Sequence, residues 1–162
     1  MSRLKLGLVG FGNWGKRHYN TWSRHTAVEV SAIYDPTYAN STPSLDSLLE
    51  NVDVVDVVVP AESLAEVASK AILAGKHTFV EKPMAISLQE AHKIEEAAKE
   101  NPSVIVMIGF IERFNPTFRK IHFAMRTLKK PLRIFCQRSG TPTLVAQKTG
   151  VLKDLAIHDV DL

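Results

Sequence analysis

The sequence has one cysteine, few aromatic residues and no apolar stretch long enough to cross a membrane. Cys136 is the single cysteine among 162 residues, so it has no partner for an internal disulfide and is expected to act as a small apolar filler. No apolar run approaches the ~20 residues that span a bilayer. The first apolar segment begins at Leu4 and is of strand length, so we expect no leader peptide. These features predict a cytoplasmic protein that does not enter a membrane.

Two further absences narrow the expected ligands. His25, His92 and His122 fall on separate predicted helices without the clustering of metal ligands, so we predict no metal site. Residues 113–153 contain ten Lys or Arg and no acidic residue. This basic segment lacks the interleaved aromatic residues of a single-strand binder and any helix-turn-helix pattern, so no nucleic acid is expected. A solvated face and an anionic small molecule remain as alternatives.

Short apolar segments alternate with helical segments along most of the chain, which is 45% hydrophobic. Near-continuous apolar runs of strand length are typical of strands buried on both faces of a parallel sheet. Their alternation with helices predicts an α/β fold, a doubly wound parallel sheet with right-handed crossovers. The predicted strands are 4–9, 28–34, 54–59, 77–81, 104–108 and 132–137, and the predicted helices are 13–24, 44–50, 62–74, 87–100, 117–129 and 151–162.

A glycine-rich turn joins the first predicted strand to the first predicted helix. It consists of Gly10, Phe11, Gly12, Asn13, Trp14 and Gly15. The first glycine permits a tight turn, the second lets a pyrophosphate approach the backbone, and the third lets helix and strand pack closely. Such turns also occur in ordinary α/β proteins. Strand, glycine turn, helix and second strand in this order nevertheless indicate a Rossmann dinucleotide-binding domain.

The second predicted strand ends in Asp35, which lies 23 residues beyond Gly12. At about this spacing an acidic residue accepts a hydrogen bond from the ribose 2′-hydroxyl, and its charge repels a 2′-phosphate. Pro36 follows, where an NADP-binding protein more often has Arg or Ser. The sequence therefore predicts NAD in preference to NADP. The alternative is that Asp35 only begins the turn at Pro36.

The fourth predicted strand ends in Glu81, Lys82 and Pro83. Lysine is costly to bury and proline interrupts the hydrogen-bond ladder, so stability does not explain this ending. At the carboxyl end of a parallel strand the lysine points into the crevice where doubly wound sheets bind ligands. We therefore expect Lys82 to face the reactive end of a bound dinucleotide; the alternative is a solvated lysine at a strand end.

Three segments in this order are similar to the Gfo/Idh/MocA oxidoreductases, a family that includes glucose–fructose oxidoreductase and inositol dehydrogenase. The segments are residues 10–18, residues 74–83 and residues 154–161. The resemblance extends from about residue 4 to residue 162. Residues 112–116 and 150–159 further resemble the branch that oxidises C3 of UDP-N-acetylglucosamine and related sugar nucleotides.

The resemblance implies catalytic roles for three residues. Lys82 corresponds to the family's lysine between nicotinamide and substrate, and His158 corresponds to its general base. Asp154 corresponds to the aspartate that binds substrate and orients the base. Asp154 and His158 are four residues apart, so on a helix they share one face, where a carboxylate favours the protonated imidazole. A surface ion pair is the alternative for these two residues.

The resemblance also implies further residues near the bound nucleotide and the substrate. Pro60 and Glu81 would line the nucleotide pocket, and Arg113 and Asn115 would lie near nicotinamide or substrate unless they only cap the helix that follows. The bond between the family's lysine and proline is often cis. His18 is expected to be a packing residue on its helix.

Together these features predict an NAD-dependent oxidoreductase that transfers hydride between a hydroxyl-bearing carbon of a sugar or sugar nucleotide and nicotinamide. The alternative is a non-catalytic NAD(H)-binding module or subunit that pairs with another chain. We expect a Rossmann domain at 1–129 and the incomplete beginning of an α+β substrate domain at 130–162, because members of the family carry a long second domain. On this expectation the chain alone is inactive, and residues 132–162 either mediate a homo-oligomer or are disordered.

Overall fold

The computed structural model describes residues 2–126, 133, 135–137 and 150–162. The chain divides into two compact units, Met1–Gly109 and Phe110–Leu162, and each is described by itself. The predicted domain boundary after residue 129 stays a prediction.

A five-stranded parallel sheet forms the centre of the first unit, with the strand order β2-β1-β3-β4-β5. Because β2 and β3 lie on opposite sides of β1, the order reverses between β1 and β3. Doubly wound sheets bind their ligands at this switch point, beyond the carboxyl ends of the strands. The predicted α/β doubly wound fold is confirmed. The strands are β1 (Leu4–Val9), β2 (Val28–Tyr34), β3 (Val54–Val57), β4 (His77–Val80) and β5 (Val106–Ile108).

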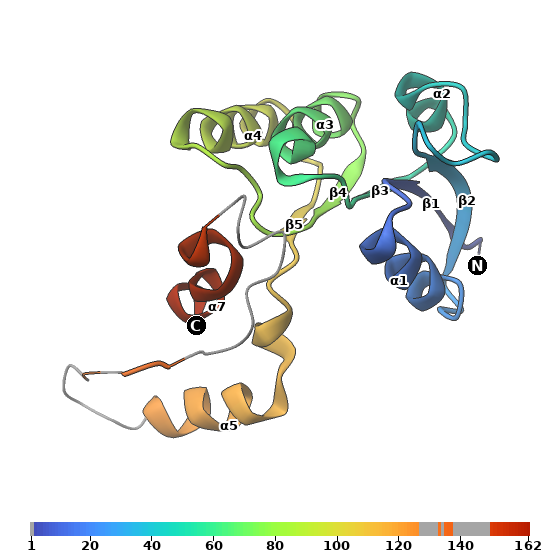
Figure 1. Cartoon of the computed structure of the whole chain (residues 1–162). Helices are drawn as coiled ribbons and strands as arrows, with labels where there is room; N and C mark the ends of the chain where they lie inside the picture. Colours follow the sequence, from blue (N-terminus) through green and yellow to red (C-terminus); the bar gives the residue numbers. More distant parts are fainter. Residues whose placement is uncertain (1, 127–132, 134, 138–149) are drawn as a thin grey trace. The chain divides into compact units, whose positions relative to one another are not determined.

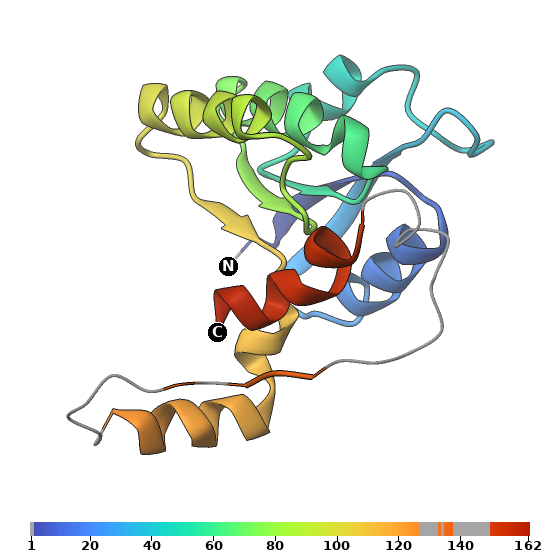
Figure 2. The same cartoon turned by 60° about the vertical axis from the view of Figure 1, so that its left-hand side comes forward.

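Helices cover both faces of this sheet, as Figures 1 and 2 show. One face carries α1 (Asn13–Trp22), and the other carries α2 (Leu45–Glu50), α3 (Ala61–Leu73) and α4 (Leu88–Glu100). Successive side chains of a strand point to opposite faces. Leu6 and Leu8 of β1 therefore pack in a cluster with side chains of α1, whereas Val55 and Val57 of β3 pack in the larger cluster with side chains of α3.

Serine caps set the starts of two of these helices. The Oγ of Ser44 accepts a hydrogen bond from the Ser47 amide at 3.0 Å, and the Oγ of Ser87 accepts one from the Glu90 amide at 3.2 Å. The Glu90 carboxylate accepts from the Ile86 amide at 2.9 Å, one residue earlier than in the standard capping box. The predicted start of α4 is thus confirmed, with its reciprocal bond shifted by one position.

The second unit contains helices and no strand among its described residues. A 3₁₀ turn at Ile111–Phe114 precedes α5 (Pro116–Met125), and a π-helix at Leu152–Ala156 continues into α7 (Ile157–Asp161). The predicted helix at 151–162 is confirmed, and its first turn is the wider π form.

Several predicted strands are longer than the observed ones. β3 ends at Val57 rather than at residue 59, β4 ends at Val80, and β5 begins at Val106 rather than at residue 104. The apolar run extends beyond β3 and before β5 because Val58, Val59 and Val104 still pack in the core without pairing as strand residues, whereas β4 is followed directly by the charged Glu81. The strand predicted at 132–137 is wrong at 133 and 135–137, which carry no strand pairing, and its other positions lie outside the described residues. A strand needs a partner in register, and an apolar run does not supply one.

Among the helices in the described part of the chain, none is long and apolar enough to span a bilayer.

Candidate nucleotide-binding site

The glycine turn closes tightly over the end of β1. Gly10 has a φ of 96°, and a Cβ there would clash with the carbonyl of Val58 at the end of β3. A Cβ on Gly15, the one buried residue of α1, would clash with the carbonyl of Gly10. Only glycine meets both demands, so the predicted roles of these two positions in turn formation and close packing are supported by geometry.

Gly12 differs from its two neighbours in the fingerprint. It is the N-cap of α1 with extended backbone, and nothing lies within 4 Å of the position that its Cβ would take. The first amides of a helix lack intrahelical acceptors and carry the positive end of the helix dipole. Open space in front of these amides forms a cradle for a phosphate group.

Asp35 faces this turn from the end of β2. Its Oδ2 accepts a hydrogen bond from the Phe11 amide at 2.6 Å, and its Oδ1 accepts from the amide and the hydroxyl of Thr37 at 2.8 and 2.7 Å. The Phe11 amide, then the Thr37 hydroxyl, hold the pKa of this carboxyl below its usual range despite partial burial. Asp35 therefore stays ionised. Its contacts with Thr37 close the turn after β2, and its contact with Phe11 orders the glycine turn.

Aromatic rings surround the same loop. The Phe11 ring lies 4.4 Å from that of Tyr38 and 5.6 Å from that of Tyr19, measured between centroids. Trp14 is 53% exposed, and the guanidinium of Arg17 lies 4.4 Å from its ring centroid. Tyr38 was not predicted, because it lies in a polar loop whose sequence has no periodicity.

Residues at the ends of β3 and β4 reach the same edge of the sheet. Pro60 is the N-cap of α3, just beyond β3. Glu81 and Lys82 follow β4, and the Glu81 Oε2 accepts a hydrogen bond from the Lys82 amide at 2.9 Å. The Lys82–Pro83 peptide bond is cis, as expected. Parallel strands end at one edge, so the glycine turn, Asp35, Pro60 and Lys82 all lie beyond the carboxyl ends of the strands, where doubly wound sheets bind ligands.

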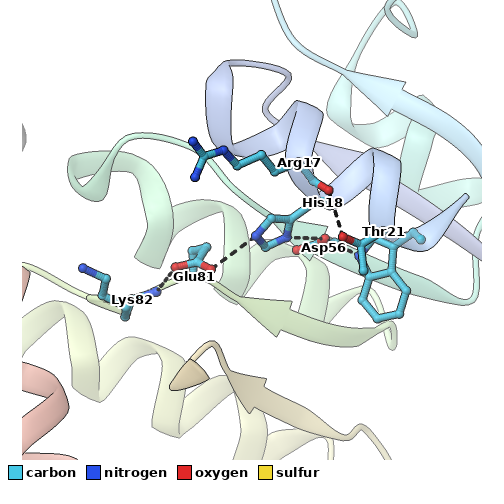
Figure 3. Close-up of polar contacts among 7 residues, drawn as sticks. Arg17, His18, Thr21, Asp56, Glu81 and Lys82 are labelled. Carbon is cyan, nitrogen blue, oxygen red and sulfur yellow. Dashed lines mark hydrogen bonds and ion pairs between the residues drawn. The ribbon is translucent and has the colours of Figure 1, made fainter. Parts of the chain in front are cut away.

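Asp56 was not predicted from the sequence, and the role assigned to His18 was too simple. His18 is not only a packing residue, because its Nδ1 lies 2.8 Å from the Asp56 Oδ2 and its Nε2 lies 3.3 Å from the Glu81 Oε1 (Figure 3). The sequence feature that could have indicated this contact is Asp56, an acidic residue in the middle of an otherwise apolar strand.

The predicted residues of the second unit lie on two helical segments. Asp154 is in the π-helix and His158 is in α7. His158 is 8% exposed and is the one buried side chain among the described residues of this unit. Short π segments within helices are frequent at functional sites, because they re-aim side chains.

Arg113 and Asn115 are both engaged within the second unit. The Arg113 guanidinium forms a two-pronged ion pair with Asp161, with Nε at 2.7 Å from Oδ2, and this hydrogen bonding raises the pKa of Arg113. Asn115 caps α5, because its Oδ1 accepts from the Thr117 amide at 3.0 Å. The capping role left open for Asn115 is thus present, and the substrate role of either residue stays a prediction.

No group of three or more metal-ligating side chains occurs in the parts of the chain that the structure describes.

The switch point between β1 and β3, the uncrowded Gly12 at the start of α1 and the ionised Asp35 at the end of β2 are features typical of dinucleotide-binding domains. They define the first unit as a dinucleotide-binding Rossmann domain. Residues 4–110 match the family described as "Oxidoreductase family, NAD-binding Rossmann fold", named GFO_IDH_MocA, and the chain belongs to this family.

Relatives extend the match beyond the first unit. UDP-N-acetylglucosamine 3-dehydrogenase of Acidithiobacillus ferrooxidans is 27% identical over 173 residues, covering 100% of this chain and 54% of the relative. Inositol 2-dehydrogenase of Salmonella typhimurium is 27% identical over 178 residues, covering 98% of this chain and 53% of the relative. The chain thus spans about half the length of the curated relatives it matches.

Solved structures show the same fold. The A. ferrooxidans enzyme superposes with a TM-score of 0.79 at 24% identity, covering 99% of this chain and 56% of that one. The scyllo-inositol dehydrogenase of Lactobacillus casei, with bound NAD(H) and scyllo-inositol, gives a TM-score of 0.73 at 20% identity, covering 78% of this chain and 42% of that one.

Proposed function

We propose that this chain carries the cofactor-binding half and the reactive residues of an NAD-dependent sugar or sugar-nucleotide dehydrogenase. The observation that carries the proposal is the open space at Gly12, in front of the first amides of α1. Gly10 and Gly15 on either side are closed by backbone contacts, so the turn is shaped to leave this one position clear. A pyrophosphate fits there because it is anionic and needs close approach to backbone amides.

Asp35 favours NAD over NADP. A carboxylate has about four lone-pair sites, and three hydrogen bonds from Phe11 and Thr37 occupy sites on both oxygens. A remaining site can accept from the ribose 2′-hydroxyl, whereas the negative charge repels a 2′-phosphate. The lowered pKa keeps that charge in place at every physiological pH.

Three residues carry the proposed chemistry. When bound, the nicotinamide accepts a hydride from the substrate carbon or returns one to it. Lys82 orients the substrate hydroxyl beside the nicotinamide site, and His158 takes the hydroxyl proton as a general base. Asp154 binds substrate and orients the base. Pro60 and Glu81 line the nucleotide site, and Arg113 and Asn115 contribute to substrate binding.

The substrate class rests on the relatives. One is a dehydrogenase of a sugar nucleotide and another is a dehydrogenase of a cyclitol, so both act on secondary hydroxyls of a six-membered ring. We extend this class to the present chain. Residues 130–162 then form the beginning of the substrate domain.

A ligand panel tests this function. NAD⁺, NADH and NADP⁺ are added to the chain singly and together with sugar nucleotides or inositols, while the melting temperature and NADH absorbance are recorded. NAD⁺ should raise the melting temperature by mass action more than NADP⁺, and a ring-hydroxyl substrate should raise it further. Where turnover is seen, His158→Ala should lower the rate ~10²–10⁴-fold, and the exposed His92→Ala serves as its control. No response to any dinucleotide would refute the proposal.

A second candidate is a non-catalytic NAD(H)-binding module or subunit that pairs with another chain, for which a second copy of this chain is the simplest test. It is favoured by exposed apolar side chains in the second unit, such as Phe123 at 73%, Phe135 at 86% and Val160 at 85%. Exposed apolar side chains are common at association surfaces when they lie together. Sedimentation as a dimer, with NAD binding and no oxidation of any substrate in the panel, would favour this candidate over the first.

A further inference from the structure

A chain of polar contacts connects the interior of the sheet to the backbone of Lys82. The Asp56 Oδ2, in the middle of β3, lies 2.8 Å from the His18 Nδ1, which belongs to α1. The other ring nitrogen of His18 lies 3.3 Å from the Glu81 Oε1, and the Glu81 Oε2 accepts from the Lys82 amide at 2.9 Å. Figure 3 shows His18 between the two carboxylates, with Lys82 at the far end.

The contacts of His18 require a protonated ring. Each ring nitrogen faces a carboxylate oxygen, and a carboxylate only accepts hydrogen bonds, so both nitrogens must donate. Burial by itself lowers the pKa of His18, but the hydrogen bonds and charges of Asp56 and Glu81 outweigh it and raise the pKa to about 9. At neutral pH the cluster is an imidazolium ion between two carboxylates.

Stability alone does not account for this cluster. Asp56 is fully buried, and its Oδ1 has no hydrogen-bond partner among the described residues. The positions two residues away on the same face of the strand are Val54 and Val58, which pack in the apolar cluster with α1. Replacing buried ion pairs by apolar residues of similar volume is often neutral or stabilising. A valine at position 56 would continue the apolar face, so the charge at this position calls for another explanation.

The charge cluster of His18, Asp56 and Glu81 holds the Glu81 carboxylate through several contacts. One carboxylate oxygen contacts His18 and the other contacts the Lys82 amide. A Cβ on Gly109, at the end of β5, would lie 3.1 Å from the Glu81 Oε1, so the backbone of β5 also closes over this carboxylate. Trp22 donates from its ring Nε1 to the Asp56 Oδ2 at 2.6 Å and holds the inner end of the chain of contacts.

We propose that His18, held by Asp56, is a positioning residue that acts through Glu81 to fix the backbone at Lys82. The inference rests on the proposed function, because it gives Lys82 a place at the reactive end of the cofactor. The ring nitrogens of His18 contact Asp56 and Glu81, so the effect of His18 on Lys82 passes through Glu81. Its role is to keep the Glu81 carboxylate turned toward the Lys82 amide, so that Lys82 leaves β4 in one direction.

The first test is amide exchange at Lys82, which needs no ligand. In His18→Gln the side chain cannot donate to both carboxylates, so Glu81 is freed and the Lys82 amide should exchange about tenfold faster. Amides inside β1 and β3 should keep their protection. His92→Gln is the matched control, because His92 is an exposed histidine 3.1 Å from a Glu95 oxygen and lies outside the cluster. Unchanged Lys82 exchange in His18→Gln would overturn the proposal.

A rescue experiment separates positioning from general destabilisation. In Asp56→Asn the ring of His18 should become neutral, with its proton on Nδ1. Its Nε2 then carries no proton and cannot donate to Glu81, so amide exchange at Lys82 should accelerate. In Asp56→Asn combined with Glu81→Gln, the glutamine amide donates to that Nε2 while its oxygen still accepts from Lys82. The double variant should regain most of the protection lost in Asp56→Asn, whereas additive losses would contradict the proposal.

Ring nitrogen shifts and ligand binding complete the test. The ¹⁵N shifts of His18 should show two N–H groups up to a pH of about 9; titration of His18 near pH 6.5 would overturn the proposal.

Ligand binding separates the two ends of the cofactor. His18→Gln should lower the affinity for NADH severalfold and leave the affinity for ADP-ribose, which lacks nicotinamide, unchanged. Equal weakening of both would overturn the positioning role. Failure of wild type to bind either ligand would refute the proposed function instead, while amide exchange would still decide whether the network orders Lys82.

Discussion

The two units of this protein differ sharply in how they bury apolar side chains. The first unit holds every buried apolar residue of the described chain, and its largest cluster joins β1, β3 and β4 to three helices. The described part of the second unit buries His158 and leaves most of its large apolar side chains exposed, including Ile111 at 71% and Leu152 at 77%.

This difference shows that the proposed cofactor-binding residues and the proposed catalytic residues Asp154 and His158 are held in place by different amounts of apolar packing. The cofactor candidates sit on a packed sheet, where backbone contacts close the glycine turn and strands fix the direction of each side chain. Asp154 and His158 lie on one helical stretch whose large apolar side chains Val151, Leu152 and Val160 are exposed. The proposed cofactor residues are therefore positioned by a buried apolar core, whereas the described residues of the second unit form no such core around the proposed base.

The comparison is tested most strongly by matched isoleucine substitutions. Ile72 in α3 is fully buried, whereas Ile111 is exposed. Ile72→Ala should lower the free energy of unfolding by ~2–5 kcal/mol, and Ile111→Ala should change it by less than about 0.5 kcal/mol. Both tryptophans, Trp14 and Trp22, belong to α1, so urea unfolding followed by their fluorescence reports on the first unit. Equal effects of the two substitutions would remove the contrast between the units.

The charge cluster of His18, Asp56 and Glu81 should make the stability of the first unit depend on pH. The pKa of His18 rises from its ordinary 6.5 to about 9 on folding, so folding takes up a proton between these values. The resulting stabilisation is complete below about pH 6.5 and is lost as pH rises through about 9. It amounts to at most roughly 3 kcal/mol. Urea unfolding of wild type and His18→Gln at pH 6, 7.5 and 9.5 measures it, and a wild-type advantage that stays constant with pH would contradict this account.

A smaller effect is expected at Asp35, which orders the glycine turn and is proposed to bind the ribose. Asp35→Ala removes the negative charge that disfavours a 2′-phosphate. The preference for NAD⁺ over NADP⁺ should therefore narrow by about tenfold, or ~1.4 kcal/mol. Calorimetric titration of both cofactors into wild type and variant gives this ratio. Equal affinity of wild type for the two cofactors would show that Asp35 does not select between them.

Local features of the fold were predictable from the sequence where a short pattern of residues has one usual structural meaning. The apolar runs gave the first four strands to within two residues, and the glycine spacing gave the turn with its three distinct positions. Ser87 likewise predicted the start of α4. Each of these signals acts within a few residues along the chain.

Contacts between distant residues were not predictable in the same way. His18 and Asp56 are 38 residues apart, and neither residue alone indicates the other. The π form at Leu152–Ala156 and the end of the apolar run beyond β3 depend on packing and on strand pairing, which hydrophobic pattern does not encode. Within the basic segment at 113–153, residues 127–132, 134 and 138–149 lie outside the described residues.

The central claim, that the glycine turn holds a dinucleotide, is tested most directly by titrating NAD⁺ into wild type and Gly12→Ala. A Cβ at Gly12 meets no protein atom, and the backbone there is extended, so the variant should unfold at the same urea concentration as wild type. The methyl group fills the space reserved for the pyrophosphate, so NAD⁺ affinity should fall more than about tenfold. Gly15→Ala is the control, since its Cβ clashes with the Gly10 carbonyl and should lower stability. Wild-type affinity in a stably folded Gly12→Ala would contradict the account.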